Sequence, residues 1–287
     1  MLCFFTAIIL LWAIGGSVVG NEVVTAGGSV GYEWPPEWLS SHCEWALPLW
    51  RTDYRLTQIS LDGTDLPPSI FKELSRCPKL DRLFLSGCHI GPDMASWKGL
   101  HNLTYISVSD VRQFGSLHVL SDLQSLNEVA LSITSGVPAA TDSPVRLPNL
   151  ASLTIGCDNH SVVQVIEMVD APQLRTLSIY IPKDHIEDVM LALKLKGWTR
   201  LLTISIHVDG GIPVDAIKSM EWMDGFEILY LCGPLRPSER WITLKHLNAL
   251  NRLSGIKRCE VVGMQVASDV KYEDATRLFP RVAIKYR

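Results

Sequence analysis

The sequence lacks the closely spaced cysteine pairs that build zinc sites and small disulfide scaffolds. Its seven cysteines are widely spaced, their number is odd, and no two of them form a C-x-x-C motif. Structural zinc sites normally use such pairs, and disulfide-dense domains are normally much shorter chains. We therefore expect no metal site and no disulfide framework.

The sequence also lacks an excess of positive charge. Lysine and arginine together number 26, against 30 aspartate and glutamate residues, and the formal net charge is -4. Proteins that bind nucleic acid usually present a basic face, so this balance argues against a nucleic-acid partner. A composition of 47% hydrophobic and 20% charged residues is that of a globular chain, which excludes both disorder and a multi-span membrane protein.

Recognisable catalytic motifs are largely missing. The chain contains no H-E-x-x-H motif and no Walker loop. Gly27-Gly-Ser-Val-Gly31 matches the G-x-S-x-G pattern, but a nucleophile elbow needs a hydrophobic strand before the serine and a helix after it. Here an apolar terminal segment precedes Ser29, and Pro35-Pro36 follows it. We predict a protein that is not an enzyme and uses no cofactor; a hydrolase built on Ser29 is the weakest alternative.

The first twenty residues lack any charged side chain. The apolar run from Leu2 to Ile14 has the length of a signal-peptide core, and the whole stretch is just long enough to span a bilayer. Small residues would allow cleavage after Gly20 or after Ala26, although no basic residue precedes the run. We expect residues 1–26 to be a signal peptide or a membrane anchor, with their cleavage and orientation left open. The protein would then be exported or membrane-tethered; the alternative is a cytoplasmic protein.

What the chain does contain is a repeat. Residues 77–90 read CPKLDRLFLSGCHI, in which the apolar residues follow the spacing L-x-x-L-x-L-x-x-C-x-L. Ten copies of the L-x-x-L-x-L core occur at intervals of 23 to 30 residues, and they begin at Leu56, Leu80, Leu103, Leu126, Leu150, Leu174, Leu201, Phe226, Ile256 and Phe279. One copy would be weak evidence because leucine is common, but ten in succession indicate a repeat architecture.

Each copy predicts a short strand whose apolar side chains point to one side. Such strands bury that side only by stacking in parallel, about 4.8 Å apart, into one continuous core. The predicted fold is therefore an α/β solenoid with a curved parallel sheet of about ten strands and connectors on its convex side. Helical connectors are expected over residues 162–169, 185–196, 215–222 and 238–250, and irregular or 3₁₀ connectors earlier in the chain, for example over 91–99.

The predicted solenoid covers residues 53–287, and residues 27–52 precede it. This preceding segment is rich in tryptophan, with Trp34, Trp38, Trp45 and Trp50, and we expect it to cap the open end of the core. Within the repeats, Cys77 and Cys88 stand where a small buried apolar residue is needed, so we expect them to act as small hydrophobic residues.

The residues between the core leucines should look out from the concave face of such a sheet. At the middle of the ten strands, five of the ten residues are serine or threonine. Aromatic residues and arginine, the usual anchors of protein interfaces, are also present on this face. We predict that a protein partner, whose identity stays open, binds there through Arg82, Phe84, Tyr105, Tyr180, His207, Tyr230 and Arg258. The alternative is that strand propensity alone placed the aromatic residues there.

From Leu56 onward the chain resembles a leucine-rich-repeat protein. The blocks ISLDGTDL at 59–66 and LFLSGCHI at 83–90 are similar to the L-x-L-S-G-T-x-I pattern of bacterial members, some of which begin with an apolar anchor followed by a segment like Gly27–Tyr32. The resemblance implies an exported or membrane-tethered binding domain without catalytic residues. The alternative within the family is an intracellular substrate adaptor of the F-box kind, which Cys88 suits, although no F-box motif precedes the repeats. The sequons at Asn102 and Asn159 do not decide the location, because chance matches are common.

Overall fold

The computed structural model describes residues 18–33, 56–63, 74, 77–87, 97, 99–111, 117–133, 144–157, 161–209, 211–223, 225–233, 241–266 and 277–285. The fold is α/β, and its main sheet has eleven mostly parallel strands. The chain divides into two compact units, Met1–Glu128 and Val129–Arg287. The predicted α/β class and the long, mostly parallel sheet are thereby confirmed.

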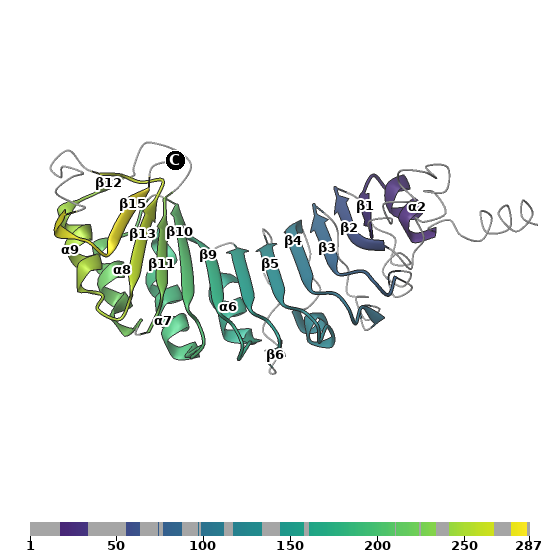
Figure 1. Cartoon of the computed structure of the whole chain (residues 1–287), viewed down its shortest axis with the longest axis horizontal. Helices are drawn as coiled ribbons and strands as arrows, with labels where there is room; N and C mark the ends of the chain where they lie inside the picture. Colours follow the sequence, from purple (N-terminus) through teal and green to yellow (C-terminus); the bar gives the residue numbers. More distant parts are fainter. Residues whose placement is uncertain are drawn as a thin grey trace, which may run out of the picture. The chain divides into compact units, whose positions relative to one another are not determined.

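The first unit contributes four strands in the order β1-β2-β3-β4 (Figure 1). They are β1 (Ser29–Tyr32), β2 (Leu56–Asp62), β3 (Arg82–Ser86) and β4 (Tyr105–Val111). Strands β2, β3 and β4 pair in parallel, as repeats require, whereas β1 pairs with β2 in the antiparallel direction. One connector of this unit is the 3₁₀ helix η4 (Leu117–Asp122), in agreement with the prediction of 3₁₀ connectors in the early repeats.

Strand β1 forms the edge of the first unit's sheet, and a short helix packs against β1 and β2. Helix α2 (Val18–Thr25) buries Val19 and Val23 completely. The chain then passes so close to β2 that a Cβ atom at Gly28 would lie only 2.6 Å from the carbonyl oxygen of Ser60, which explains the glycine. The predicted signal peptide or anchor at 1–26 overlaps α2, while residues 1–17 and the four tryptophans of the predicted cap lie outside the described residues. No helix among the described residues is long and apolar enough to cross a membrane.

The second unit contributes seven strands, in the order β5-β7-β9-β10-β11-β13-β15. Neighbouring strands from β7 to β15 all pair in parallel. The strands are β5 (Glu128–Ile133), β7 (Ser152–Cys157), β9 (Thr176–Pro182), β10 (Thr203–Asp209), β11 (Ile228–Cys232), β13 (Arg258–Val262) and β15 (Val282–Lys285). Two pairs of two-residue strands accompany them: β6 (Val145–Arg146) with β8 (Val169–Asp170), and β12 (Trp241–Ile242) with β14 (Gln265–Val266).

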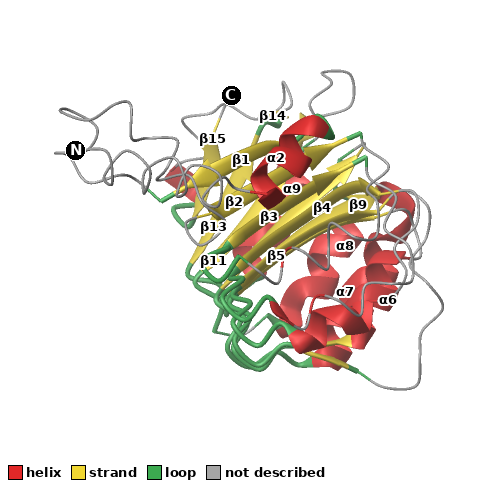
Figure 2. Cartoon of the chain, turned by 90° about the vertical axis from the view of Figure 1, so that its right-hand side faces the viewer, coloured by secondary structure: helices red, strands yellow, loops and turns green. Residues whose placement is uncertain are grey.

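Helical connectors lie along one side of the second unit's strands (Figure 2). They are α6 (Ser161–Met168), η5 (Lys183–His185) with α7 (Ile186–Lys196), α8 (Val214–Lys218) with η6 (Ser219–Trp222), and α9 (Leu244–Arg252). Three of the four predicted helical segments agree with these bounds to within one or two residues.

The fourth predicted helix, over residues 238–250, is wrong at its start. Trp241 and Ile242 form a strand instead, and the helix begins only at Leu244. The reason is a capping box, in which the backbone N–H of Thr243 donates to Nδ1 of His246, 3.2 Å away. A residue that caps a helix has an extended backbone, so the two preceding residues are free to pair with β14.

The core of each unit is a column of apolar side chains in register. In the second unit Leu177 lies opposite Leu153 on one neighbouring strand and Ile204 on the other. All ten residues that begin the predicted copies are buried, with no more than 6% of any of them exposed. The alternating side chains of a strand point to opposite faces, so this column places the intervening residues on the other face of the sheet.

The turn that leads into each strand also repeats. The amide N–H of the first core residue donates to the carbonyl oxygen three residues earlier, as from Leu80 to Cys77 and from Leu174 to Ala171. Side chains then link one turn to the turn of the preceding repeat, as Asn102 does by donating its amide N–H to the carbonyl oxygen of Pro78. The repeats are therefore joined through backbone, loops and core alike.

Candidate binding surface

The exposed face is the side of the sheet that carries the residues between the buried apolar residues of each strand. The structure aligns the predicted mid-strand residues of neighbouring repeats in register on this face. In the first unit they are Ser60, Phe84 and Ser107, and in the second they are Thr154, Ser178, Ser205, Tyr230, Glu260 and Ala283. The spacing of the repeat thus predicts correctly which mid-strand residues lie opposite one another on the exposed face.

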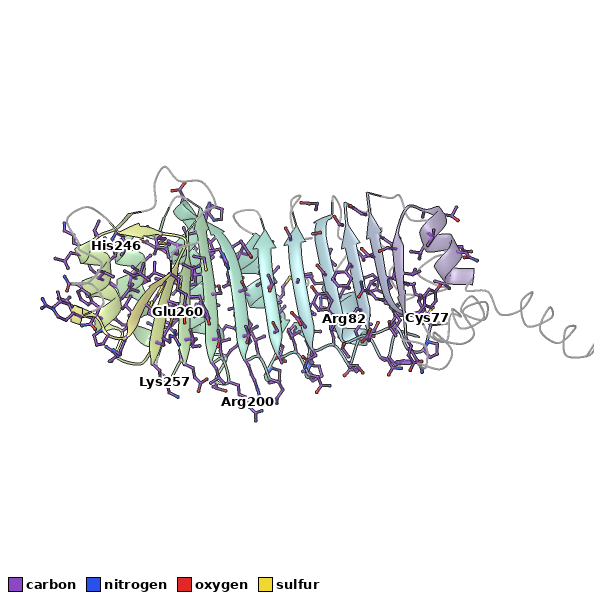
Figure 3. All side chains as sticks on the ribbon, turned by 45° about the horizontal axis from the view of Figure 1, so that its top comes forward. Cys77, Arg82, Arg200, His246, Lys257 and Glu260 are labelled. Carbon is purple, nitrogen blue, oxygen red and sulfur yellow. The ribbon has the colours of Figure 1, made fainter. Side chains whose placement is uncertain are left out.

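The seven predicted binding residues fall into two groups, one in each unit. In the first unit the rings of Phe84 and Tyr105 lie 5.0 Å apart between centroids and are tilted by 41°. Arg82 lies opposite Tyr105 in the register of β3 and β4, and its side chain is exposed (Figure 3). A guanidinium group beside two half-buried rings is a combination that protein interfaces use often.

In the second unit Tyr180 and His207 form a stack. They lie opposite each other on β9 and β10, their ring centroids are 4.1 Å apart, and the rings are within 13° of parallel. The stack leaves Tyr180 49% exposed, which is unusual for a large aromatic side chain on a regular strand. This pair is the most prominent feature of the exposed face in the second unit.

Hydrogen bonding fixes the imidazole ring of this stack. The Oγ atom of Ser205 lies 3.1 Å from Nε2 of His207 and 3.9 Å from Sγ of Cys232. In the register of β10 and β11, Cys232 lies opposite His207. The sequence placed Ser205 at a mid-strand position of this face, but neither Ser205 nor Cys232 was among the predicted binding residues. Counting along the repeat from His207 would have found Cys232, because it occupies the same position one strand further on.

An ion-paired carboxylate lies at the other end of the second unit's exposed face. Oε1 of Glu260 is 2.8 Å from Nη2 of Arg258, and Oε2 is 2.5 Å from Nζ of Lys285 (Figure 3). The Glu260 side chain is only 3% exposed, whereas both cations are about half exposed. Glu260 therefore ties the edge strand β15 to β13 and holds the predicted binding residue Arg258 in place. Tyr230, on β11, is the partner of Glu260 in the strand register.

The described core cysteines behave as small apolar residues. Cys77 and Cys259 are buried, and burial, together with the nearby Glu260 carboxylate, raises the pKa of the Cys259 thiol to about 12. A thiol with so high a pKa carries almost no thiolate at neutral pH and is a poor nucleophile and a poor metal ligand. The prediction for Cys77 is confirmed, and Cys88 lies outside the described residues.

The surroundings of Ser29 differ from those of a nucleophile elbow. Helix α2 comes before Ser29, and the serine opens the edge strand β1, where it lies opposite Ser60. An elbow has the opposite order, with the strand first and the helix second. Among the described residues, moreover, no three His, Cys, Asp or Glu side chains gather closely enough to hold a metal ion.

Of the two sequons, the structure describes only the one at Asn102. Its side-chain nitrogen, the atom that would carry a glycan, donates the hydrogen bond to Pro78 that links two repeat turns. Glycosylation at Asn102 would therefore have to replace a contact between repeats. Asn159 lies outside the described residues.

Comparison with known proteins adds no assignment. No protein-family model matches the chain, and no curated protein has significant sequence similarity to it. The function is therefore inferred from the repeat and from the chemistry of the exposed face.

Proposed function

We propose that this chain is a leucine-rich-repeat protein whose exposed sheet face binds another protein without catalysing a reaction. The regular column of buried leucine, isoleucine and valine side chains supports the family assignment, because it matches the expected repeat position by position. A stacked sheet of this kind offers a broad, regular surface of the sort that repeat proteins use for binding.

The chemistry of the exposed face favours a protein as the partner. Small hydroxyl side chains provide hydrogen-bonding groups without bulk, and the centres of protein interfaces are typically poor in charge. Tyrosine and arginine supply the large anchors that dominate binding energy in such interfaces. The overall net charge of -4 gives no support to nucleic acid as the partner.

The single observation that carries the proposal is the exposed stack of Tyr180 on His207. A tyrosine that serves only to stabilise a strand gains most when its ring is covered by neighbouring side chains. Here one side of the ring is covered by His207, yet about half of the side chain still meets solvent. Exposed aromatic surface held rigidly in this way is typical of a binding site.

Photo-crosslinking in cells tests which face meets the partner. A benzophenone amino acid at Ser178, next to the stack on the exposed face, should crosslink to a protein partner. The matched control is the same amino acid at Glu187, which is exposed on helix α7 on the other side of the sheet. Adducts from Ser178 and none from Glu187 are expected; equal labelling from both positions, or labelling from Glu187 alone, would refute the proposed binding face.

Once the partner is identified, alanine substitution measures the contribution of the aromatic residues. Tyr180→Ala and Tyr230→Ala should each weaken binding by about tenfold or more, since truncating a hot-spot residue costs about 2 kcal/mol or more and about 1.4 kcal/mol corresponds to tenfold. The variants should keep the wild-type circular dichroism spectrum, because neither side chain is buried in the core. Unchanged affinity in both variants would contradict the proposal.

We also propose that the protein is exported or membrane-tethered, because a stretch of twenty uncharged residues at the start has few uses in a cytoplasmic protein. A protease-protection assay on cells that express a C-terminally tagged full-length chain tests the location. Digestion of the tag from outside intact cells, or its protection inside a sealed secretory compartment, is expected. A tag recovered in the soluble cytosolic fraction would favour the intracellular adaptor instead.

A further inference from the structure

A buried carboxylate stands out among the aligned mid-strand residues of the second unit. Within the set Thr154, Ser178, Ser205, Tyr230, Glu260 and Ala283, Glu260 alone is charged, and its side chain is only 3% exposed. A buried charge is costly to desolvate, so an uncharged threonine, as on β7, would suit the strand as well. The reason for a glutamate at this position lies in its two ion pairs.

Glu260 holds two cations in fixed positions. Arg258 lies two residues earlier on β13, and its Nη2 atom is 2.8 Å from Oε1 of Glu260. Lys285 belongs to β15, opposite Val262, and its Nζ atom is 2.5 Å from Oε2 of Glu260. The two cations are therefore attached to neighbouring strands, on opposite sides of Glu260 along the strand direction. Arg258, Glu260 and Lys285 together are called the Glu260 clamp below.

The Glu260 clamp carries more positive charge than its carboxylate can balance. Arg258 and Lys285 share one carboxylate, and neither forms an ion pair with a second acidic side chain among the residues described. One unit of positive charge is therefore left over. The side chains of the two cations are 54% and 53% exposed, and a guanidinium has five donors and an ammonium three. Donor groups thus remain accessible from solvent on both cations.

The geometry of the Glu260 clamp fits a second carboxylate. Glu260 itself shows that the two oxygen atoms of one carboxylate reach both cations, at 2.8 and 2.5 Å. A carboxylate that approaches from the solvent side meets the same two cations and balances the charge that is left over. Charge-assisted hydrogen bonds of this kind are stronger than neutral ones. Because Glu260 already restrains both cations, binding would cost little additional side-chain entropy.

The size of the charge excess favours a carboxylate over a polyanion. Nucleic acids and anionic membranes present many phosphates, and proteins that bind them neutralise several at once, whereas the Glu260 clamp offers one unbalanced charge. The surrounding sequence would attract an acidic group from a longer distance. Residues 256–287 contain seven lysine and arginine residues against four aspartate and glutamate residues, whereas the whole chain has 26 against 30. Charge complementarity of this kind steers an acidic partner towards β13 and β15.

We propose that the Glu260 clamp binds an acidic side chain of the protein partner, an aspartate or glutamate whose carboxylate bridges Arg258 and Lys285. This assignment rests on the proposed function and specifies it: the partner places an acidic residue over β13 and β15. The predicted binding residue Arg258 thereby gains a specific contact, and Glu260 gains the purpose of holding that contact ready.

Nuclear magnetic resonance with the full-length protein tests the clamp through two probes that differ only in charge. N-acetylglutamic acid α-amide carries one side-chain carboxylate, and N-acetylglutaminamide is its neutral analogue of nearly the same shape. At tens of millimolar, a range suited to weak fragment binding, the acidic probe should shift the Nε–Hε signal of Arg258 and the amide signal of Val262 in a saturable way. The neutral probe should not, and about 0.5 M salt should weaken the response to the acidic probe. Equal responses to the two probes refute the proposal.

Two variants with the same change in net charge locate the response. The triple variant Arg258→Gln, Glu260→Gln, Lys285→Gln loses one unit of positive charge in total and leaves no buried charge without a partner, so it should keep the wild-type fold. Its backbone amide response should fall at least about threefold. Lys257→Gln also removes one unit, from an exposed lysine that pairs with Glu227, and should preserve the response. Equal losses in both variants would show attraction to net charge alone and would refute the clamp.

The wild-type protein alone identifies the wrong occupants, so the test stands even if the triple variant does not fold. Tighter binding of dimethyl phosphate, a singly charged mimic of the phosphates of nucleic acids and lipids, would make the clamp a phosphate site and overturn the assignment. The absence of a saturable shift with the acidic probe overturns it as well.

The crosslinking experiment separates this assignment from the function on which it rests. Crosslinks from Ser178 without a charge-dependent probe response refute the acidic contact alone. A charge-dependent response without crosslinks from Ser178 refutes the protein-binding function, and with it the identity of the occupant.

Discussion

Truncation of one core leucine tests the energetic basis of the repeat. Leu177 is completely buried and lies between Leu153 and Ile204, its partners on the two neighbouring strands. Leu177→Ala removes side-chain atoms that are covered by the equivalent residues of both adjacent repeats. The regular hydrogen bonding of β9 to β7 and to β10 restrains the backbone from closing the resulting cavity.

The expected cost of Leu177→Ala is about 2–5 kcal/mol in the free energy of unfolding. This range combines the lost transfer of buried apolar atoms from water, roughly 1.5–3 kcal/mol for a whole leucine side chain, with the cost of the cavity. We expect a value in the upper half, since partners on both sides confine the cavity. Ser178→Ala, at the adjacent residue on the exposed face, is the matched control and should change stability by no more than about 0.5 kcal/mol.

Urea denaturation followed by far-ultraviolet circular dichroism measures both variants. Because the chain forms two compact units, the transitions should be fitted for each phase that is observed rather than forced into one step. The reasoning is refuted if Leu177→Ala is no more destabilising than Ser178→Ala, because Leu177 would then not belong to a tightly packed column.

Three further predictions concern single residues outside that column. Asp110, in β4, adopts a positive φ of 52°, so Asp110→Ala should be less stable to urea than Asp110→Gly by roughly 1 kcal/mol; equal stabilities would contradict a strained backbone at this residue. Burial lowers the pKa of His246. Its neutral ring accepts a hydrogen bond from the N–H of Thr243 and donates one to the carbonyl oxygen of Ile212. Because the pKa is lower in the folded state, the unfolded state binds more protons at pH values near this pKa. Stability should accordingly fall as the pH drops below about 6.5, and His246→Gln should flatten this part of the melting-temperature profile, whereas an unaltered profile would refute the assignment. With a pKa of about 12, the buried Cys259 thiol should resist iodoacetamide in the folded protein and react only after unfolding, as peptide mapping would show; alkylation in the native state would contradict the burial.

The sequence alone predicts the strands because their signal is both periodic and repeated. A single L-x-x-L-x-L match such as that at Leu174 has little weight, but ten successive copies fix the register of every strand relative to its neighbours. The alternation within a strand then decides which face is buried, and the structure agrees at Leu177, Ser178 and Ile179. For this reason the exposed face could be predicted residue by residue.

The elements at the ends of repeats were harder to predict because local chemistry determines them. The start of α9 depends on the Thr243–His246 capping box, in which histidine takes the place usually held by glutamate or glutamine. The antiparallel strand β1 and the helix α2 follow no repeat, so periodicity gives no information on them. Their packing on β2 depends on contacts between distant parts of the chain, such as that of Gly28 with Ser60.

In the candidate site, too, some residues could be predicted from the sequence and others could not. Tyr180, His207 and Tyr230 were predicted because large aromatic residues at exposed strand positions stand out in the sequence. Cys232 was missed because a small side chain gives no such signal, and its place beside His207 follows from the register of β10 and β11.

The most direct test of the central claim is a methyl nuclear Overhauser measurement on the full-length protein with labelled leucine and isoleucine. If the repeats stack in parallel and in register, the methyl groups of Leu177 should show cross-peaks to those of both Leu153 and Ile204. Cross-peaks to neither residue would contradict the stacked repeat, and with it both the exposed face and its proposed partner site.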